Sequence, residues 1–298
     1  MKNFDESVYC DKDTEILSDI EHTPIKITDN VKIYINDENL DYSNTRYVDK
    51  FYFYKNDTII GNSLRHYGEY TELEIELLKN FIKPHHAIYD VGANIGYHTV
   101  AFSRLAKHVY AFEPNQKNLK LLKKNIKECK NVTVFDVACS NTNTELKIQD
   151  FDIDKPGNYG EMLISDTGQT CKAVTIDDLD DIYAPDVLKI DVEGHELQVL
   201  RGTIKTIVEF EPIIFYEAHG TELAEIYDLL TDLGYRLYWY PCPNYNPRNH
   251  KRNTTNIFGY GGVVNILALP KSHKKIENLV SVINRDDTIQ QAFSRANK

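Results

Sequence analysis

A glycine-spaced loop that directly follows an apolar segment is the feature that most constrains how this 298-residue chain can fold. The apolar segment 87–91 contains Asp90, and Gly92 and Gly96 follow in a D-x-G-x-x-x-G pattern before a stretch of helical periodicity. Glycine is needed where the backbone takes a positive φ or comes close to a ligand. A strand, a glycine loop and a helix in this order predict the first crevice of a doubly wound α/β sheet, where nucleotide-like ligands bind.

Apolar segments alternate with helical patterns through most of the chain. Strands are predicted at residues 87–91, 108–112, 132–137, 187–192, 212–216, 235–240 and 263–269, with helices at 97–105, 115–129, 196–207 and 221–233 between them. A further helix is predicted from Thr71, which forms a capping-box pattern with Glu74, and ends before Pro84. This alternation indicates a mainly parallel sheet, and the last two strands, which no helix separates, are expected to pair antiparallel.

The chain divides into three parts by pattern. Residues 1–65 are rich in polar turns and short β-type segments at 24–27, 31–35 and 51–54, which predicts a small β-rich N-terminal extension. Residues 66–271 hold the α/β pattern and are expected to form the main domain. Residues 272–298 carry apolar side chains at helical spacing and predict a C-terminal amphipathic helix.

Charge and cysteine content disfavour several classes of function. Lys and Arg total 34 and Asp and Glu total 45, which gives a net charge of −11 and lowers the expectation of a nucleic-acid partner. No apolar stretch approaches the roughly 20 residues that span a membrane. The five scattered cysteines include no C-x-x-C pair, which argues against disulfides and thiolate zinc. We expect a cytoplasmic protein, monomeric or weakly homodimeric, because a charge far from zero favours solubility.

The glycine loop predicts an adenosine-containing ligand. A dinucleotide would need a closely spaced glycine pair for its pyrophosphate, and that pair is absent. S-adenosylmethionine has no phosphate but carries an ammonium and a sulfonium, and Asp90 offers them a negative charge. Glu113 ends the second strand, where an acid reaches ribose hydroxyls. Asp136, near the end of the third strand, is expected at the adenine edge.

A second group of acidic residues follows two later strands. Asp191 and Glu193 end the strand at 187–192, Glu217 ends the next strand, and His219 lies two residues further on. Carboxylates gathered at adjacent strand ends repel one another and need a cation, a shared proton or hydrogen bonds. Capping of the following helix is the alternative, which we favour for Glu196. We favour a catalytic role for Asp191 and Glu217.

Several segments resemble the FkbM-type S-adenosylmethionine-dependent methyltransferases. They are GEYTELEIELLKNFIKPHHAIYDVGANIGYHTVAF, VYAFEPN and VLKIDVEGHELQVLRG, and the resemblance covers about residues 68–270 in order. It implies an α/β class I methyltransferase (Rossmann-like) fold with seven strands, the last one antiparallel. It also implies O-methylation of sugars, glycans or polyketide-type molecules. Cofactor contacts are implied for Glu72, Asp90, Gly92, Asn94, Gly96 and Glu113.

Methyl transfer to an alcohol needs help with the hydroxyl proton. Either His219 takes that proton while Glu217 orients it, or Asp191 and Glu217 hold Mg²⁺ or Ca²⁺ that acidifies the hydroxyl. We favour a base and commit to no metal, because two carboxylates alone make an incomplete metal site. Acceptor binding is expected from Glu193 and from an asparagine-rich segment at 244–259 through Asn246, Arg248 and Lys251.

Two other functions compete with O-methylation of a sugar, glycan or small molecule. One is methylation of a non-sugar acceptor. The other is a non-catalytic module that binds an adenosine cofactor, which a loss of the strand-end acids would indicate. Those acids are present here, so we expect an enzyme.

Overall fold

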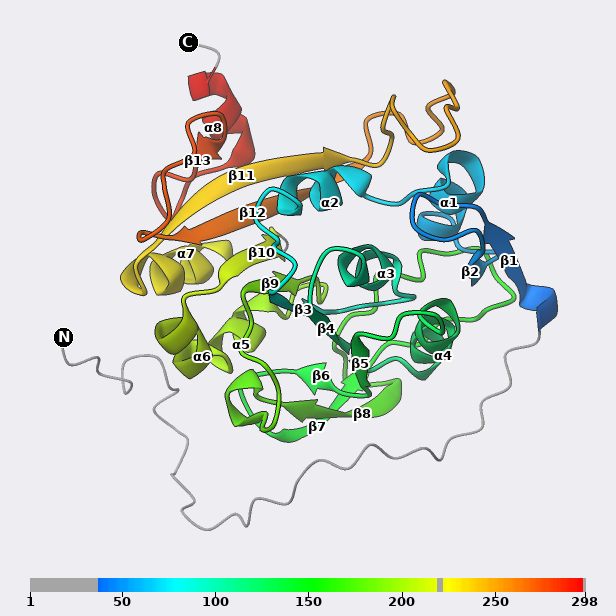
Figure 1. The fold of residues 1–298 in the computed structure, drawn as a ribbon, viewed down its shortest axis with the longest axis horizontal. Helices are drawn as coiled ribbons and strands as arrows, with labels where there is room; N and C mark the ends of the chain where they lie inside the picture. The colour runs from blue at the N-terminus through cyan, green and yellow to red at the C-terminus, as the bar shows by residue number, and fades with distance from the viewer. Residues whose placement is uncertain (1–36, 219–221, 297–298) are drawn as a thin grey trace.

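The computed structural model describes residues 37–218 and 222–296, and an eight-stranded sheet lies at its centre (Figure 1). Five neighbouring strands run parallel, and they are β5 (Val132–Phe135), β4 (His108–Phe112), β3 (Ala87–Val91), β9 (Val187–Ile190) and β10 (Ile213–Glu217). Strand β12 (Gly262–Pro270) lies antiparallel between β10 and β11 (Tyr235–Pro243). The predicted seven-stranded α/β fold with an antiparallel last strand is therefore confirmed, and β13 (Val280–Ser281) adds an eighth strand beside β11.

Helices cover both faces of the sheet, because the strands direct alternate side chains into two separate apolar cores. On β3, Ile88 belongs to the first core and Tyr89 to the second. The first core includes side chains of α1 (Ile60–Tyr67), α2 (Glu72–Leu78), α3 (Tyr97–Ser103) and α4 (Gln116–Asn125). The second includes side chains of α5 (Glu196–Arg201), α6 (Ile204–Phe210), α7 (Leu223–Asp232) and α8 (Ile289–Ala296).

A three-stranded sheet, which the sequence pattern did not predict, lies beside the main one. It consists of β6 (Ala138–Cys139), β8 (Gln169–Val174) and β7 (Thr144–Ile148). Its strands carry mixed polar and apolar residues with few long apolar runs, so they resembled a connection. In sequence, these three strands lie between β5 and β9.

The N-terminal part forms a hairpin of β1 (Leu40–Ser43) and β2 (Phe51–Tyr54), followed by α1. The strand predicted at residues 51–54 is confirmed, whereas those predicted at 24–27 and 31–35 lie outside the described residues. Phe51 and Phe53 are fully buried in the first core of the main sheet. The hairpin therefore shares its core with the α/β domain.

Three local predictions were wrong. Thr71 does not cap α2 with its side chain; its backbone is left-handed at φ 41°, and its hydroxyl lies 3.1 Å from the Nε2 atom of His98. The helix predicted at 196–207 divides into α5 and α6, because Gly202 packs against the carbonyl of Ser140. A Cβ atom at Gly202 would lie 1.9 Å from that oxygen.

The third wrong prediction is one continuous helix through residues 272–298. Within residues 272–296, the part of this stretch that the structure describes, there is strand β13 at Val280–Ser281 and one helix, at Ile289–Ala296. Val280 pairs with Trp239 on the outer edge of β11, where backbone groups need hydrogen-bond partners. Burial of apolar residues against a sheet edge outweighs the helical spacing here.

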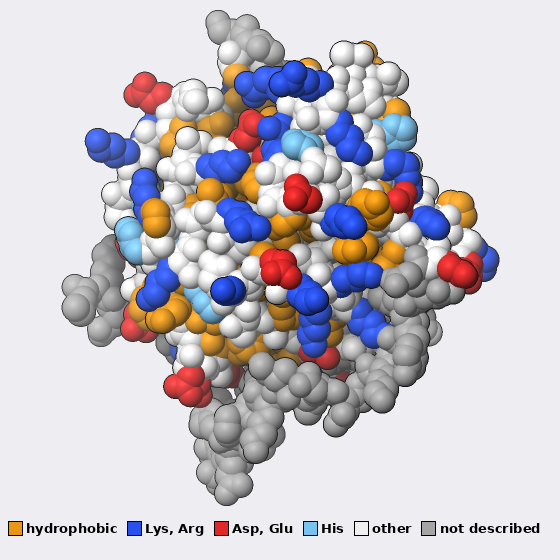
Figure 2. All heavy atoms as spheres, turned by 45° about the vertical axis from the view of Figure 1, so that its right-hand side comes forward, with side chains coloured by type: hydrophobic (Ala, Val, Ile, Leu, Met, Phe, Trp, Pro, Cys, Tyr) orange, Lys and Arg blue, Asp and Glu red, His pale blue; other side chains and the backbone are white. Residues whose placement is uncertain are grey.

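The surface in Figure 2 mixes charges of both signs. Lys and Arg side chains are spread over this face among acidic and apolar ones. Among the described residues, no helix is long and apolar enough to cross a membrane.

Candidate functional site

The glycine loop brings the ends of β3 and β9 into close contact. Gly92 has a φ of +80°, and a Cβ atom there would lie 1.8 Å from the backbone oxygen of Asp191. Gly96, with a φ of +91°, is the N-cap residue directly before α3, and Asn94 between the two glycines also has a positive φ of 51°. No other residue type fits at Gly92, because the atom in the way belongs to the backbone of the neighbouring strand end.

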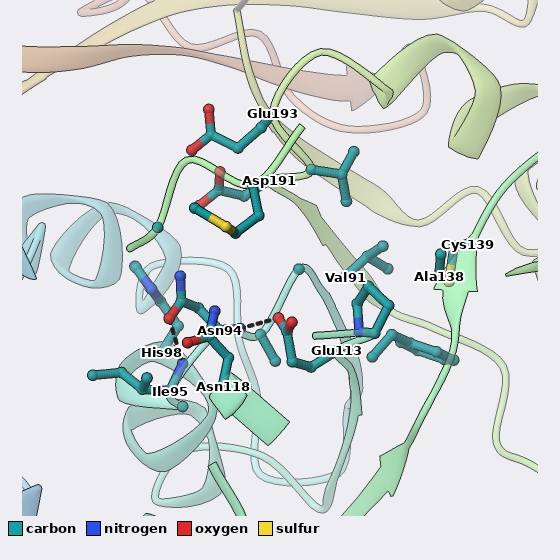
Figure 3. A pocket seen from close by; sticks show the side chains of 18 of the residues that line it. Val91, Asn94, Ile95, His98, Glu113, Asn118, Ala138, Cys139, Asp191 and Glu193 are labelled. Carbon is teal, nitrogen blue, oxygen red and sulfur yellow. Dashed lines mark hydrogen bonds between the residues drawn. The ribbon is translucent and has the colours of Figure 1, made fainter. Parts of the chain in front are cut away.

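A cavity lies at the carboxyl ends of β3, β4 and β9, as expected for a ligand site in a parallel sheet (Figure 3). It is bounded by the glycine loop, the end of β4, the start of the three-stranded sheet and the residues after β9. We call it the first cavity. Its walls include Gly92, Asn94, Gly96, His98, Glu113, Asn118, Val137, Ala138, Cys139, Gly160, Met162, Asp191, Glu193 and His195.

Glu113 occupies the position predicted for it, at the end of β4 and in the wall of the first cavity. Its two carboxylate oxygens accept hydrogen bonds from the backbone N–H groups of Asn94 and Asn115, each at 2.8 Å. Burial raises the pKa of Glu113 to about 7, although these hydrogen bonds oppose the increase. The carboxylate is therefore held rigidly while it can still accept further hydrogen bonds.

Asp90 does not reach the first cavity. It is fully buried, its Oδ2 atom accepts a hydrogen bond from the Thr99 hydroxyl at 2.6 Å, and its Oδ1 atom lies 3.4 Å from the Nζ atom of Lys189. Lys189 also lies 3.2 Å from Asp191 Oδ2. Burial alone lowers the pKa of Lys189, but Asp191 and Asp90 raise it above its usual value. The charge of Asp90 thus neutralises a buried lysine that sequence reasoning missed.

Asp136 also lies outside the walls of the first cavity. Its Oδ1 atom accepts a hydrogen bond from the side-chain amide of Gln116 at 2.5 Å. The residues directly after it, 137–139, line the cavity instead. His195 also lines the cavity, with its Nε2 atom 3.0 Å from the Ser140 hydroxyl.

Glu72 is buried away from the cavities. It accepts hydrogen bonds from the hydroxyls of Tyr47 at 2.5 Å and Tyr97 at 3.1 Å. The cations of Arg46 and Lys79 each lie 3.6 Å from its Oε1 atom. Glu72 therefore connects the N-terminal hairpin region to α3, and the structure gives it no contact with a ligand site.

The strand-end acids come together as the sequence predicted. One carboxylate oxygen from each of Asp191, Glu193 and Glu217 lies within 4.8 Å of the others. Burial, followed by the negative charge of Asp191, raises the pKa of Glu193 to about 8 and that of Glu217 to about 10. The Oε2 atom of Glu217 is buried without a hydrogen-bond partner. His219 lies outside the described residues.

A second cavity adjoins the first one, and the two share Tyr70, Gly160, Asp191 and Glu193 as walls. Asp191 and Glu193 thus lie on their common boundary, and Glu217 lies beside them in the second cavity. The remaining walls of the second cavity come from α2, the 158–161 segment and strand β12 with its preceding residues. They include Thr71, Glu74, Asn158, Glu161, Glu217, Asn244, Gly261, Gly262, Val263 and Asn265.

The asparagine-rich segment does not contribute the three residues predicted for it. Asn246 is buried and donates a hydrogen bond to Glu69 at 2.8 Å, and Lys251 donates one to the backbone oxygen of Arg65 at 2.8 Å. Arg248 is largely exposed and lies 3.5 Å from Glu76. None of the three is among the described residues that line either cavity. Only Asn244, at the start of the segment, reaches the second cavity.

The strand order and the paired cavities at the strand ends define a class I methyltransferase-like fold. The model of the methyltransferase FkbM domain matches residues 90–237, and the chain belongs to this family of methyltransferases. Membership of the family implies use of S-adenosylmethionine.

Similar proteins are known from sequence and from structure. The hexuronic acid methyltransferase AglP of Haloferax volcanii is 27% identical over 162 residues, which are 53% of this chain and 66% of that protein. The FkbM methyltransferase of Methylobacillus flagellatus is 18% identical with a TM-score of 0.43, over 62% of this chain and 44% of that one. The precorrin-6y C5,15-methyltransferase of Geobacter metallireducens is 18% identical with a TM-score of 0.42, over 67% of this chain and 87% of that one. The match thus spans just under two thirds of AglP.

The raised pKa of Glu217 makes folding stability depend on pH. The unfolded carboxyl ionises near pH 4.5 and the folded one near 10, so the folded state loses stability as pH rises between these values. We expect Glu217→Gln to be more stable than the unmodified protein at pH 8, by on the order of 1–2 kcal/mol, and about equal at pH 5. Urea unfolding at the two pH values measures this. The exposed Glu209→Gln should change neither, and a Glu217→Gln protein less stable at pH 8 would contradict the argument.

Proposed function

We propose that this chain is an S-adenosylmethionine-dependent O-methyltransferase whose acceptor is a hydroxyl of a sugar, glycan or small molecule. The observation that carries the proposal is the boundary between the two cavities, where Asp191 and Glu193 belong to both walls. A cofactor in the first cavity and an acceptor in the second would meet there. AglP acts on a hexuronic acid, which supports a sugar acceptor for this chain as well.

The residues of the first cavity suit the cofactor. The left-handed glycine loop gives a close backbone approach, Glu113 offers a fixed carboxylate for ribose hydroxyls, and the apolar residues 137–139 suit an adenine ring. The opposite end of the cavity carries Asp191 and Glu193, whose negative charge favours an ammonium or sulfonium. Asp90 acts indirectly, since it fixes Lys189 and through it Asp191.

S-adenosylmethionine supplies, when bound, an electrophilic methyl group on a sulfonium. The protein aligns the acceptor hydroxyl with that methyl and removes the hydroxyl proton. Glu217 and Glu193 have raised pKa values, so an ionised member of the cluster is a stronger base than an ordinary carboxylate. The proton lost by the hydroxyl is then shared within the cluster. Exclusion of water from the boundary favours the transfer, because positive charge disappears in the transition state.

The first test concerns Glu113 and cofactor binding. Glu113→Gln should weaken binding of S-adenosylhomocysteine by about 1–3 kcal/mol, because hydrogen bonds to a charged acceptor are lost. With a pKa of about 7, the Glu113 carboxylate is ionised at pH 8 and mostly protonated at pH 6, so affinity should rise up to about tenfold between them. The variant should show no such rise. Calorimetry measures both, and Asp136→Asn is the control expected to bind normally.

The second test concerns proton removal. Below its pKa of about 10 Glu217 is mostly protonated, so only its ionised fraction can accept the proton, and kcat should rise with pH toward that value. Glu217→Gln should lower kcat by at least about 100-fold, the lower end for loss of a general base, and abolish the rise, while the affinity for S-adenosylhomocysteine stays within about twofold. His219→Ala in the same assay tests the imidazole as the alternative base. Full turnover of Glu217→Gln would contradict the assignment. Activity lost in EDTA and restored by Mg²⁺ would transfer the role from a free carboxylate to a metal bound by the three acids.

The charge of the second cavity bears on the acceptor. Five acidic side chains line it (Glu74, Glu161, Asp191, Glu193 and Glu217), and none of its described lining residues is Lys or Arg. A uronate would bring a further carboxylate into this cavity, and like charges at close range are unfavourable. The basic residues Arg248 and Lys251 make their contacts elsewhere. We therefore expect an uncharged or amino-bearing sugar rather than a uronate.

A panel of matched acceptors checks this expectation. A neutral hexoside, the corresponding amino-hexoside and the corresponding hexuronoside should be methylated with kcat/KM values that are at least about tenfold lower for the hexuronoside. Arg248→Ala and Lys251→Ala should leave these values unchanged. A preference for the hexuronoside that disappears in those two variants would place the acceptor against the basic segment instead.

A further inference from the structure

Asn118 is a polar residue of the first cavity to which sequence reasoning gave no function. It lies in the first turn of α4 and is only 2% exposed, yet it is one of the residues that line the cavity. Figure 3 shows it among the side chains around Asn94 and Glu113. Its Oδ1 atom is buried and has no hydrogen-bond partner within the protein. A buried amide oxygen without a partner is unfavourable, and ligands are a common reason for its presence.

The orientation of the Asn118 amide is fixed by its other end. Its Nδ2 atom donates a hydrogen bond to the backbone oxygen of Tyr159 at 3.4 Å. That oxygen only accepts hydrogen bonds, so a rotation of the amide by 180° would place two acceptors against each other. The acceptor Oδ1 is thus the free end of the side chain. A ligand that satisfies it must bring a donor.

The position of Asn118 along the cavity selects among the donors of the cofactor. The ammonium is expected at the other end, beside Asp191 and Glu193, where the negative charges gather. Asn118 instead lies near Asn94 and Glu113, apart from Asp191 and Glu193 (Figure 3). The donors expected beside Glu113 are the ribose hydroxyls.

We infer that the Oδ1 atom of Asn118 accepts a hydrogen bond from a ribose hydroxyl, and that Asn118 with Glu113 reads the ribose of the cofactor. This inference rests on the proposed function, because it assumes that the first cavity binds S-adenosylmethionine. It adds a neutral acceptor to the charged one. The neutral amide keeps one ribose contact that does not depend on the protonation of Glu113 near pH 7.

The test measures binding of S-adenosylhomocysteine and its 2′-deoxy and 3′-deoxy analogues by calorimetry. In the unmodified protein, one analogue should bind about tenfold more weakly than S-adenosylhomocysteine, because the missing hydroxyl leaves Asn118 unpaired. In Asn118→Ala, S-adenosylhomocysteine itself should bind about tenfold more weakly. The additional loss for that analogue should shrink to about twofold, because the variant has no acceptor left to discriminate.

Two further variants separate ribose recognition from a structural role. Asn118→Asp keeps an acceptor oxygen and should retain discrimination against the same analogue. Asn125→Ala removes another buried asparagine of α4, which contacts Tyr52 and the backbone oxygen of Ile95, and should leave the discrimination intact even if overall binding weakens. An unchanged discrimination in folded Asn118→Ala overturns the inference while the proposed function stands. Failure of the unmodified protein to bind S-adenosylhomocysteine overturns both.

Discussion

A single buried lysine connects the parts of this candidate site. Lys189 is only 2% exposed, and its ammonium lies between Asp90 at the end of β3 and Asp191 after β9. A buried charge of either sign is costly alone, so Lys189 and the fully buried Asp90 require each other. Asp191, whose side chain is 34% exposed, is a second partner for Lys189. The same strand ends meet again through Gly92, which has no room for a Cβ beside the backbone of Asp191. The position of Asp191, and hence the boundary between the cavities, follows from these two contacts.

Glu193 and Glu217, the two acids beside Asp191, differ from it in their charge partners. Glu193 and Glu217 have no buried cation within ion-pair distance among the described residues, and Glu193 adopts a left-handed backbone at φ 53°. Positive φ in a residue with a side chain costs energy and is found preferentially at functional sites. Repulsion from Asp191, which Lys189 keeps close, raises the pKa of both glutamates after the effect of burial. The Lys189–Asp191 ion pair therefore holds in place the charge that makes the adjacent carboxylates more basic.

The sequence predicted the elements that have simple periodicity and strong residue preferences. The mainly parallel sheet with its last strands antiparallel, the glycine loop and the convergence of Asp191 with Glu217 follow from apolar runs, the helical patterns between them and the acids at their ends. The direction of individual side chains did not follow. Asp90 lies within β3, where successive side chains alternate between faces, and the pattern does not show that Lys189 of β9 lies opposite it. Asn246 and Lys251 were expected at the acceptor, but Glu69 and the Arg65 backbone, 177 and 186 residues away, bind them instead.

The N-terminal hairpin contacts a segment that forms part of the wall of the first cavity. Gly160 and Met162, in the connection between β7 and β8, line the first cavity. That connection is held by the Tyr159 ring, which stacks on Phe151 at 4.3 Å and packs edge-on against Tyr54 of β2 at 5.6 Å between ring centroids. The backbone N–H of Thr58 adds a hydrogen bond to the Gly157 oxygen at 2.9 Å. Tyr54 and Thr58 thus contact the connection that supplies Gly160 and Met162 to the cavity wall.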